Sequence, residues 1–124
     1  MDIVERKLSV AEVLSKAADL IEQTGLAKGA LARDADGEVV TYDSEDAVCF
    51  CGLGAVSRID RDQRVFDAAW DAANAICPPT KPGEPAAFAH WQDNPIRTQE
   101  DVVAKLREAA RIAALTPPLP LVGE

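Results

Sequence analysis

The stretch DSEDAVCFCGLGAVSRI, residues 43–59, sets two cysteines and two glycines among apolar residues. Acidic and hydroxyl residues at its start are typical of a helix N-terminus, and the apolar run that follows predicts a helix beginning near Asp43 or Ser44. Two interpretations follow. The segment is either a core helix built for close packing or a helix that carries a thiol site.

Gly52 and Gly54 would lie inside this helix, where each costs about 1 kcal/mol relative to alanine. Close approach of another helix is the simplest compensation, because Ala47, Cys51 and Ala55 would extend the surface of small residues. A pocket lined by glycine is the functional alternative.

Helical periodicity recurs on both sides of this stretch. The expected helices are residues 8–24, a helix that starts near Asp60, a short helix over 86–91, and a last helix over 98–115. Ser9 with Glu12 predicts a capping box, and Thr98 with Asp101 predicts a cap for the last helix.

The segment after the first helix has a different pattern. Residues 34–37, DADG, predict an Asx turn, and residues 30–33 could pair with 39–41 as a hairpin. We therefore expect a mainly α fold: a small single-domain bundle of about four helices with a short β-hairpin or extended segment after helix 1. Residues 1–116 would form the domain, and 117–124 a proline-rich extended or disordered tail.

The composition and net charge make some classes of function less likely than others. The chain has 124 residues, of which 48% are hydrophobic and only 5% aromatic, so the core must be mostly aliphatic. Its formal charge of −8 makes direct nucleic-acid binding unlikely on electrostatic grounds, since phosphates would be repelled. We expect a protein partner instead, and a homodimer is left open.

The three cysteines do not indicate a secreted disulfide framework, because their number is odd. The first residues, MDIVERKLSV, lack the apolar segment of a signal peptide, and no apolar run approaches the roughly 20 residues of a membrane helix. The expected location is cytoplasmic, with no membrane association.

Cys49, Cys51, Cys77 and His90 make a complete zinc set by residue type. Their spacing argues against it, because a Cys-x-Cys pair on a helix would direct its two sulfurs to nearly opposite sides. The favoured interpretation is small buried side chains and no cofactor, with zinc as the alternative.

A reactive thiol is the third interpretation. A cysteine in the first turn of a helix has a lowered pKa. His90 could then act as the base, with Asp93 or Asn94 as the orienting group. The acidic residues before the helix oppose this by raising a thiol pKa, so we expect no enzyme and assign no catalytic residue.

Trp91 begins a polar turn and would anchor that turn in the core, or else form a protein-binding hot spot on the surface. The candidate binding residues of the chain are Cys49, Cys51, Gly52, His90, Trp91, Asp93 and Asn94.

Three segments together resemble a known family: AADLIEQTGLAKGALARDADG (17–37), AVCFCGLGAV (47–56) and WQDNPIRTQEDVVAKLREAA (91–110). It is a family of short proteins of unknown function from actinobacteria, some proteobacteria and their bacteriophages, with a C-x-C-x-L-G-A helix and a tryptophan turn. Asp93 and Asn94 stand in the reverse of its usual order. The resemblance covers residues 14–110 and implies no catalytic residues. It implies a phage or mobile-element context, and with it an accessory or counter-defence role.

The leading expectation is a small acidic, non-enzymatic binding or accessory module. It would act by protein–protein contact, through its acidic surface or residues 78–97. The alternative is a small-molecule or metal-binding domain with a pocket near the Cys49/Cys51 helix and the turn from His90 to Asn94.

Overall fold

Helix α1 (Val10–Thr24) begins at a capping box. The Oγ of Ser9 accepts a hydrogen bond from the N–H of Glu12 at 3.1 Å, and Glu12 Oε1 accepts from the N–H of Ser9 at 2.8 Å. The first predicted helix is therefore confirmed. The structure is a computed structural model, and it describes residues 9–60, 62–77, 82–83 and 87–115.

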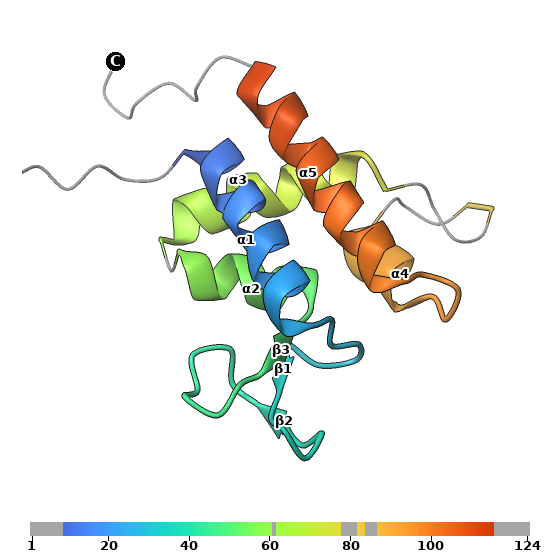
Figure 1. Cartoon of the computed structure of the whole chain (residues 1–124). Coiled ribbons are helices and arrows are strands. Elements are labelled where there is room, and N and C mark those ends of the chain that lie inside the picture. Colours follow the sequence, from blue (N-terminus) through green and yellow to red (C-terminus); the bar gives the residue numbers. More distant parts are fainter. Residues whose placement is uncertain (1–8, 61, 78–81, 84–86, 116–124) are drawn as a thin grey trace, which may run out of the picture.

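Helix α5 (Gln99–Leu115) runs antiparallel to α1, and these two helices form the largest interface between elements (Figure 1). Thr98 caps α5 with Asp101, as predicted. The two helices face each other with apolar stripes, since both bury Val, Leu or Ile together with Ala. The buried residues are Val13, Leu14, Ala17, Ala18 and Ile21 on α1, and Val102, Val103, Leu106, Ala109 and Ala110 on α5.

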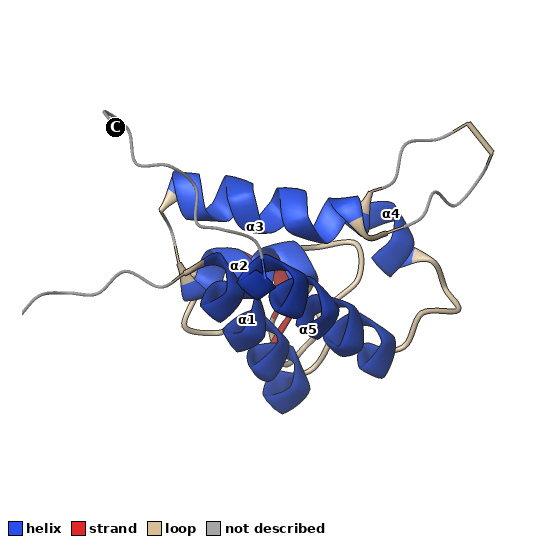
Figure 2. Ribbon diagram, turned by 90° about the horizontal axis from the view of Figure 1, so that it is seen from above, coloured by secondary structure: helices blue, strands red, loops and turns tan. Residues whose placement is uncertain are grey.

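Three more helices complete the bundle: α2 (Gly52–Ile59), α3 (Gln63–Ala75) and the short α4 (Phe88–Asp93). Figure 2 shows α3 along one side of the α1–α5 pair, with α4 beside its C-terminal end. The mainly α class is thus confirmed. Asn74 fixes the start of α4, because its Oδ1 accepts a hydrogen bond from the N–H of Phe88 at 2.7 Å.

The prediction for residues 43–59 was wrong at its N-terminal half. Residues 43–48 are not helical, Cys49–Phe50 form strand β3, and α2 starts only at Gly52, with Cys51 as its N-cap. The backbone before Gly52 is occupied elsewhere: Phe50 N–H donates to Gly25 O, and Cys51 N–H donates to Leu31 O at 3.1 Å. These long-range hydrogen bonds replace those that a longer helix would have made.

The strands form a small antiparallel sheet of order β2-β1-β3 at one end of the helices (Figure 1). β1 (Ala32–Arg33) pairs with β2 (Val39–Val40) in the register Ala32 to Val40, which confirms the hairpin. β1 also pairs with β3, Ala32 opposite Phe50, which the sequence did not predict.

Two other expectations concern the ends of elements. α3 begins after Asp62 rather than near Asp60, because the Asp62 carboxylate accepts from the N–H of Arg64 at 3.0 Å. The tail predicted at 117–124 lies outside the described residues. None of the helices that the structure describes combines the length and the apolarity of a membrane span.

Gly54 packs so closely against the chain before β1 that a Cβ there would overlap the backbone carbonyl of Leu31. A backbone atom cannot swing aside as a side chain can. The contact therefore explains a glycine within a helix, where alanine would normally be favoured by about 1 kcal/mol.

We predict that Gly54→Ala lowers the free energy of unfolding by roughly 1–3 kcal/mol, since overpacking outweighs the gain in helix propensity. Urea unfolding followed by circular dichroism measures it. Ser57→Ala, on the same helix, is the control and should change stability by less than about 0.5 kcal/mol. A Gly54→Ala protein that is more stable than the parent would contradict the close contact.

Candidate functional site

A cavity of about 250 Å³ lies where the start of α2 meets α3, α4 and the chain at 29–31. We call it the Cys51 cavity. Its walls are mainly apolar, and its polar side chains, Gln92 and Asp93, come from α4. It is lined by Gly29, Ala30, Leu31, Cys51, Leu53, Trp70, Phe88, Ala89, Gln92 and Asp93.

Gln92 is the one buried polar side chain among the described residues, and it is held at both ends. Its Oε1 accepts a hydrogen bond from the N–H of Gly52 at 2.6 Å, and its Nε2 donates to Asp93 Oδ1 at 3.1 Å. The amide thus satisfies a free N–H of the first turn of α2, the role usually taken by a capping side chain. An amide nitrogen carries two hydrogens, so Nε2 keeps a second donor.

Gly52 allows α4 to approach. A Cβ at this position would overlap the ring of Phe88, and the Gln92 amide lies close to it as well. The predicted close helix approach is therefore present at Gly52, and the partner is α4. At Gly54 the partner is the backbone of Leu31 rather than a helix.

Cys51 is buried, and its Sγ accepts a hydrogen bond from the N–H of Gly54 at 3.3 Å. Burial raises the pKa of the Cys51 thiol, and the nearby Asp93 carboxylate raises it further, while the N–H groups of Gly54 and Leu53 oppose the shift. The thiol is therefore protonated at neutral pH. A position at the start of a helix does not by itself make this cysteine a nucleophile.

Asp93 is exposed at the end of α4 and gives the cavity a negative rim. None of the lining residues is basic. An apolar cavity with one carboxylate and one amide can hold a small molecule by shape and by polar contact.

The remaining predicted residues are spread over different surroundings. Cys49 is half-buried, with its Sγ 3.9 Å from Arg33 O, and Asn94 is half-buried, with its carbonyl accepting from Lys28. His90 is exposed and does not line the Cys51 cavity. The structure therefore brings Cys51 and Asp93 to one cavity, with Gly52 bonded to Gln92 beside it, and His90 and Cys49 do not line that cavity.

Trp91 is buried, in agreement with the core-anchor interpretation. Its ring lies 5.8 Å from that of Phe88, and the Arg97 guanidinium lies over it at 4.6 Å. Its location inside the core removes it from the surface hot spot that was the alternative.

Cys77 is buried two residues after the end of α3. Burial raises its pKa to about 11, with Lys105 opposing the shift. Across residues 9–60, 62–77, 82–83 and 87–115, no group of three or more His, Cys, Asp or Glu could hold a metal ion. The described residues therefore provide no arrangement of ligands that supports the zinc interpretation.

Sequence reasoning missed Gln92, Trp70 and Leu31 as site residues. Gln92 has the clearest signal in retrospect, because a buried amide beside a helix start must find partners. Leu31 gives no local signal, since only the tertiary contact with Gly54 brings its backbone to α2.

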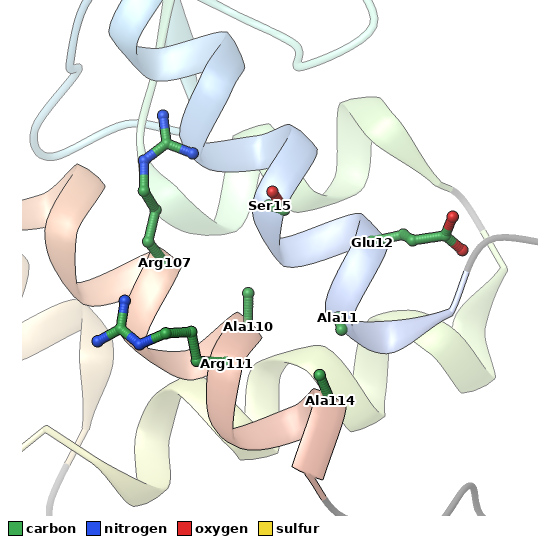
Figure 3. A pocket seen from close by; sticks show the side chains of 7 residues that line it. All are labelled: Ala11, Glu12, Ser15, Arg107, Ala110, Arg111 and Ala114. Carbon is green, nitrogen blue, oxygen red and sulfur yellow. The ribbon is translucent and has the colours of Figure 1, made fainter.

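A second hollow, a groove of about 400 Å³, lies between α1 and α5 (Figure 3). Its floor consists of small residues, and none of the candidate binding residues lines it. The lining residues are Ala11, Glu12, Ser15, Arg107, Ala110, Arg111 and Ala114. Arg107 forms ion pairs with Asp19 and Glu22, both at 2.9 Å. One of the two arginines that line the groove is therefore already engaged in the α1–α5 interface.

We predict that Gln92→Leu lowers the free energy of unfolding by about 1–3 kcal/mol, because the N–H of Gly52 loses its buried acceptor. Chemical denaturation measures the change. Gln23→Leu, at an exposed position of α1, is the matched control and should be nearly neutral. If the two substitutions changed the free energy of unfolding equally, the hydrogen bond from Gly52 to the Gln92 amide would not contribute to stability.

We predict that the protein loses stability as pH rises from about 9 to about 11, because the unfolded Cys77 thiol ionises before the folded one. The contribution is complete below the unfolded pKa and amounts to at most about 2–3 kcal/mol. Urea unfolding of the parent and of Cys77→Ala across this range tests it. The variant should show the shallower decline, and parallel curves would contradict the assignment.

No curated protein and no solved structure matches the chain. A family model, described as a family of unknown function (DUF6197), matches residues 5–112. That match spans most of the sequence and every described helix except the end of α5, and the chain therefore belongs to the DUF6197 family.

Proposed function

We propose that the protein is a non-enzymatic binding module that contacts a basic protein partner through an acidic lobe, residues 34–48. The lobe comprises β2 and the loops on either side of it, at the end of the molecule away from the start of α1 (Figure 1). The observation that carries the proposal is the coincidence of dense negative charge and exposed valines on this one projection.

The lobe contains six carboxylates and no lysine or arginine. They are Asp34, Asp36, Glu38, Asp43, Glu45 and Asp46. Asp34 also builds the lobe, because its Oδ1 accepts from the N–H groups of Asp36 and Glu38, which is the Asx turn that the sequence predicted. Arg58 holds the other loop, donating to the carbonyls of Tyr42 and Ser44.

Two valines stand out of the same lobe. Val39 is 63% exposed and Val48 is 44% exposed. Single exposed apolar residues are common, but here two lie in one acidic segment, Val39 on the edge strand β2 and Val48 in the loop before β3. Apolar contact gives binding energy, while the surrounding charge selects partners of opposite sign and speeds their association.

The partner expected from this chemistry is a protein with a basic surface that carries a small apolar patch. Nucleic acid is the wrong sign. The phage or mobile-element setting, the accessory or counter-defence role and the cytoplasmic location remain part of the proposal, supported by the sequence resemblance and by the cysteine pattern. A homodimer through the lobe is disfavoured, because like charges would meet.

We predict that Glu45→Gln/Asp46→Asn weakens binding of a captured partner by roughly threefold to tenfold, because two exposed carboxylates are lost from the contact. The partner is first recovered from a lysate of the native host on the immobilised chain, then purified and measured by calorimetry at two salt concentrations. Binding by the parent should weaken with salt.

The matched control is Asp71→Asn/Glu100→Gln, which removes the same charges from exposed sites on α3 and α5. This control should bind like the parent. A partner that binds the lobe variant as tightly as the control, or a lysate that yields nothing beyond background, would overturn the proposal.

A second candidate function is small-molecule binding at the Cys51 cavity. The observation that favours it is the meeting of Cys51, Gln92 and Asp93 around about 250 Å³ of largely apolar space. This candidate does not need the acidic lobe, so the two functions can be tested separately.

A further inference from the structure

The Cys51 cavity has an asymmetric chemistry that restricts its ligand. Its inner walls are apolar and include the rings of Trp70 and Phe88, whose centroids lie 5.8 Å apart. Its polar side is formed by Gln92 and Asp93 on the last turn of α4. A ligand that fits would present one polar end to α4 and an apolar body to the rings.

The polar side is acceptor-rich and negative. Asp93 is exposed at the rim, and its Oδ1 accepts a hydrogen bond from the Gln92 amide. Its charge reaches into the cavity, since it contributes to the raised pKa of Cys51. The neighbouring cation Lys28 is engaged elsewhere, because its Nζ donates to the carbonyls of Asn94 and Arg97 at 3.0 and 2.7 Å.

These surroundings favour a cation over an anion. An ammonium group at the rim would meet the Asp93 carboxylate in a charge-assisted hydrogen bond and would stay partly hydrated, so its desolvation would be small. A bound carboxylate or phosphate would face Asp93 with no basic side chain among the lining residues to offset the repulsion.

The volume limits the ligand's size. An apolar cavity of about 150 Å³ is enough for benzene, so about 250 Å³ admits one ring, or a branched alkyl group, with a short side chain. Trp70 adds an aromatic face of the kind that attracts both rings and organic cations.

We propose that the Cys51 cavity binds a small organic monoamine, with its ammonium group on the Asp93 carboxylate and its ring or branched alkyl body against Trp70 and Phe88. The proposal rests on the second candidate function, small-molecule binding at this cavity, and gives it a ligand class. Gln92 orients Asp93 through its Nε2 donor. Cys51 serves as a neutral wall.

The test uses three probes of nearly equal size: 2-phenylethylamine, the neutral 2-phenylethanol and the anionic phenylacetate. Titration is followed by the indole N–H signals of ¹⁵N-labelled protein. Trp70 lines the cavity and Trp91 does not, so the second tryptophan is an internal control. The amine should shift the Trp70 signal and bind about tenfold tighter than the alcohol, with phenylacetate weaker still.

Three variants of the chain test the site directly. Asp93→Asn keeps an acceptor for Gln92 but removes the charge, so it should abolish the preference for the amine while leaving the alcohol unchanged. Asp71→Asn, an exposed aspartate on α3, should leave all three affinities as they are. Leu53→Trp fills the cavity and should abolish binding of both amine and alcohol.

The outcomes separate the two levels of the proposal. If the alcohol or phenylacetate binds as tightly as the amine, the amine assignment falls and the small-molecule candidate stands. If Asp93→Asn keeps the full preference, the assignment of the ammonium site falls. If none of the probes shifts Trp70, both the ligand class and the second candidate function are overturned.

Discussion

The close approach of three chain segments at the start of α2 is the constraint on which the rest of the structure depends. Gly52 admits the ring of Phe88, and Gly54 admits the backbone of Leu31. These two contacts fix α4 and the chain before β1 against one short helix. Because both are made at glycine, they require no compensating movement of side chains, and the helix bundle and the sheet can share a single core.

The same constraint creates the candidate site. When α4 lies against Gly52, Gln92 comes within hydrogen-bonding distance of the N–H of that residue and turns Asp93 toward the cavity. Phe88 and Trp70, whose rings lie 5.8 Å apart and are tilted by 58°, then form part of its wall. The acidic lobe is positioned by different contacts, through Arg58 and the β1 pairing. The molecule thus has two separable surfaces, each with its own physical origin.

The sequence predicted what local chemistry controls. The α1 and α5 caps follow from residues three apart, and the hairpin follows from the Asx turn at Asp34. The start of α2 could not be predicted from the neighbouring residues. The N–H groups of Phe50 and Cys51 donate to the carbonyls of Gly25 and Leu31, which are distant in sequence. Only part of the site was predicted, because its residues are also brought together by contacts between segments distant in sequence. Cys51 and Asp93 line one cavity, whereas His90, on the same helix as Asp93, is exposed and does not line it.

The position of β2 at the edge of the sheet affects how the protein behaves at high concentration. β2 is an edge strand of two residues, and an unpaired edge invites the strands of other copies to extend the sheet. Here Glu38, next to Val39, and the nearby Asp36 would meet their own counterparts in any such stack. The lobe that is proposed to attract a basic partner therefore also protects the chain against edge-to-edge aggregation, and screening by salt would weaken that protection.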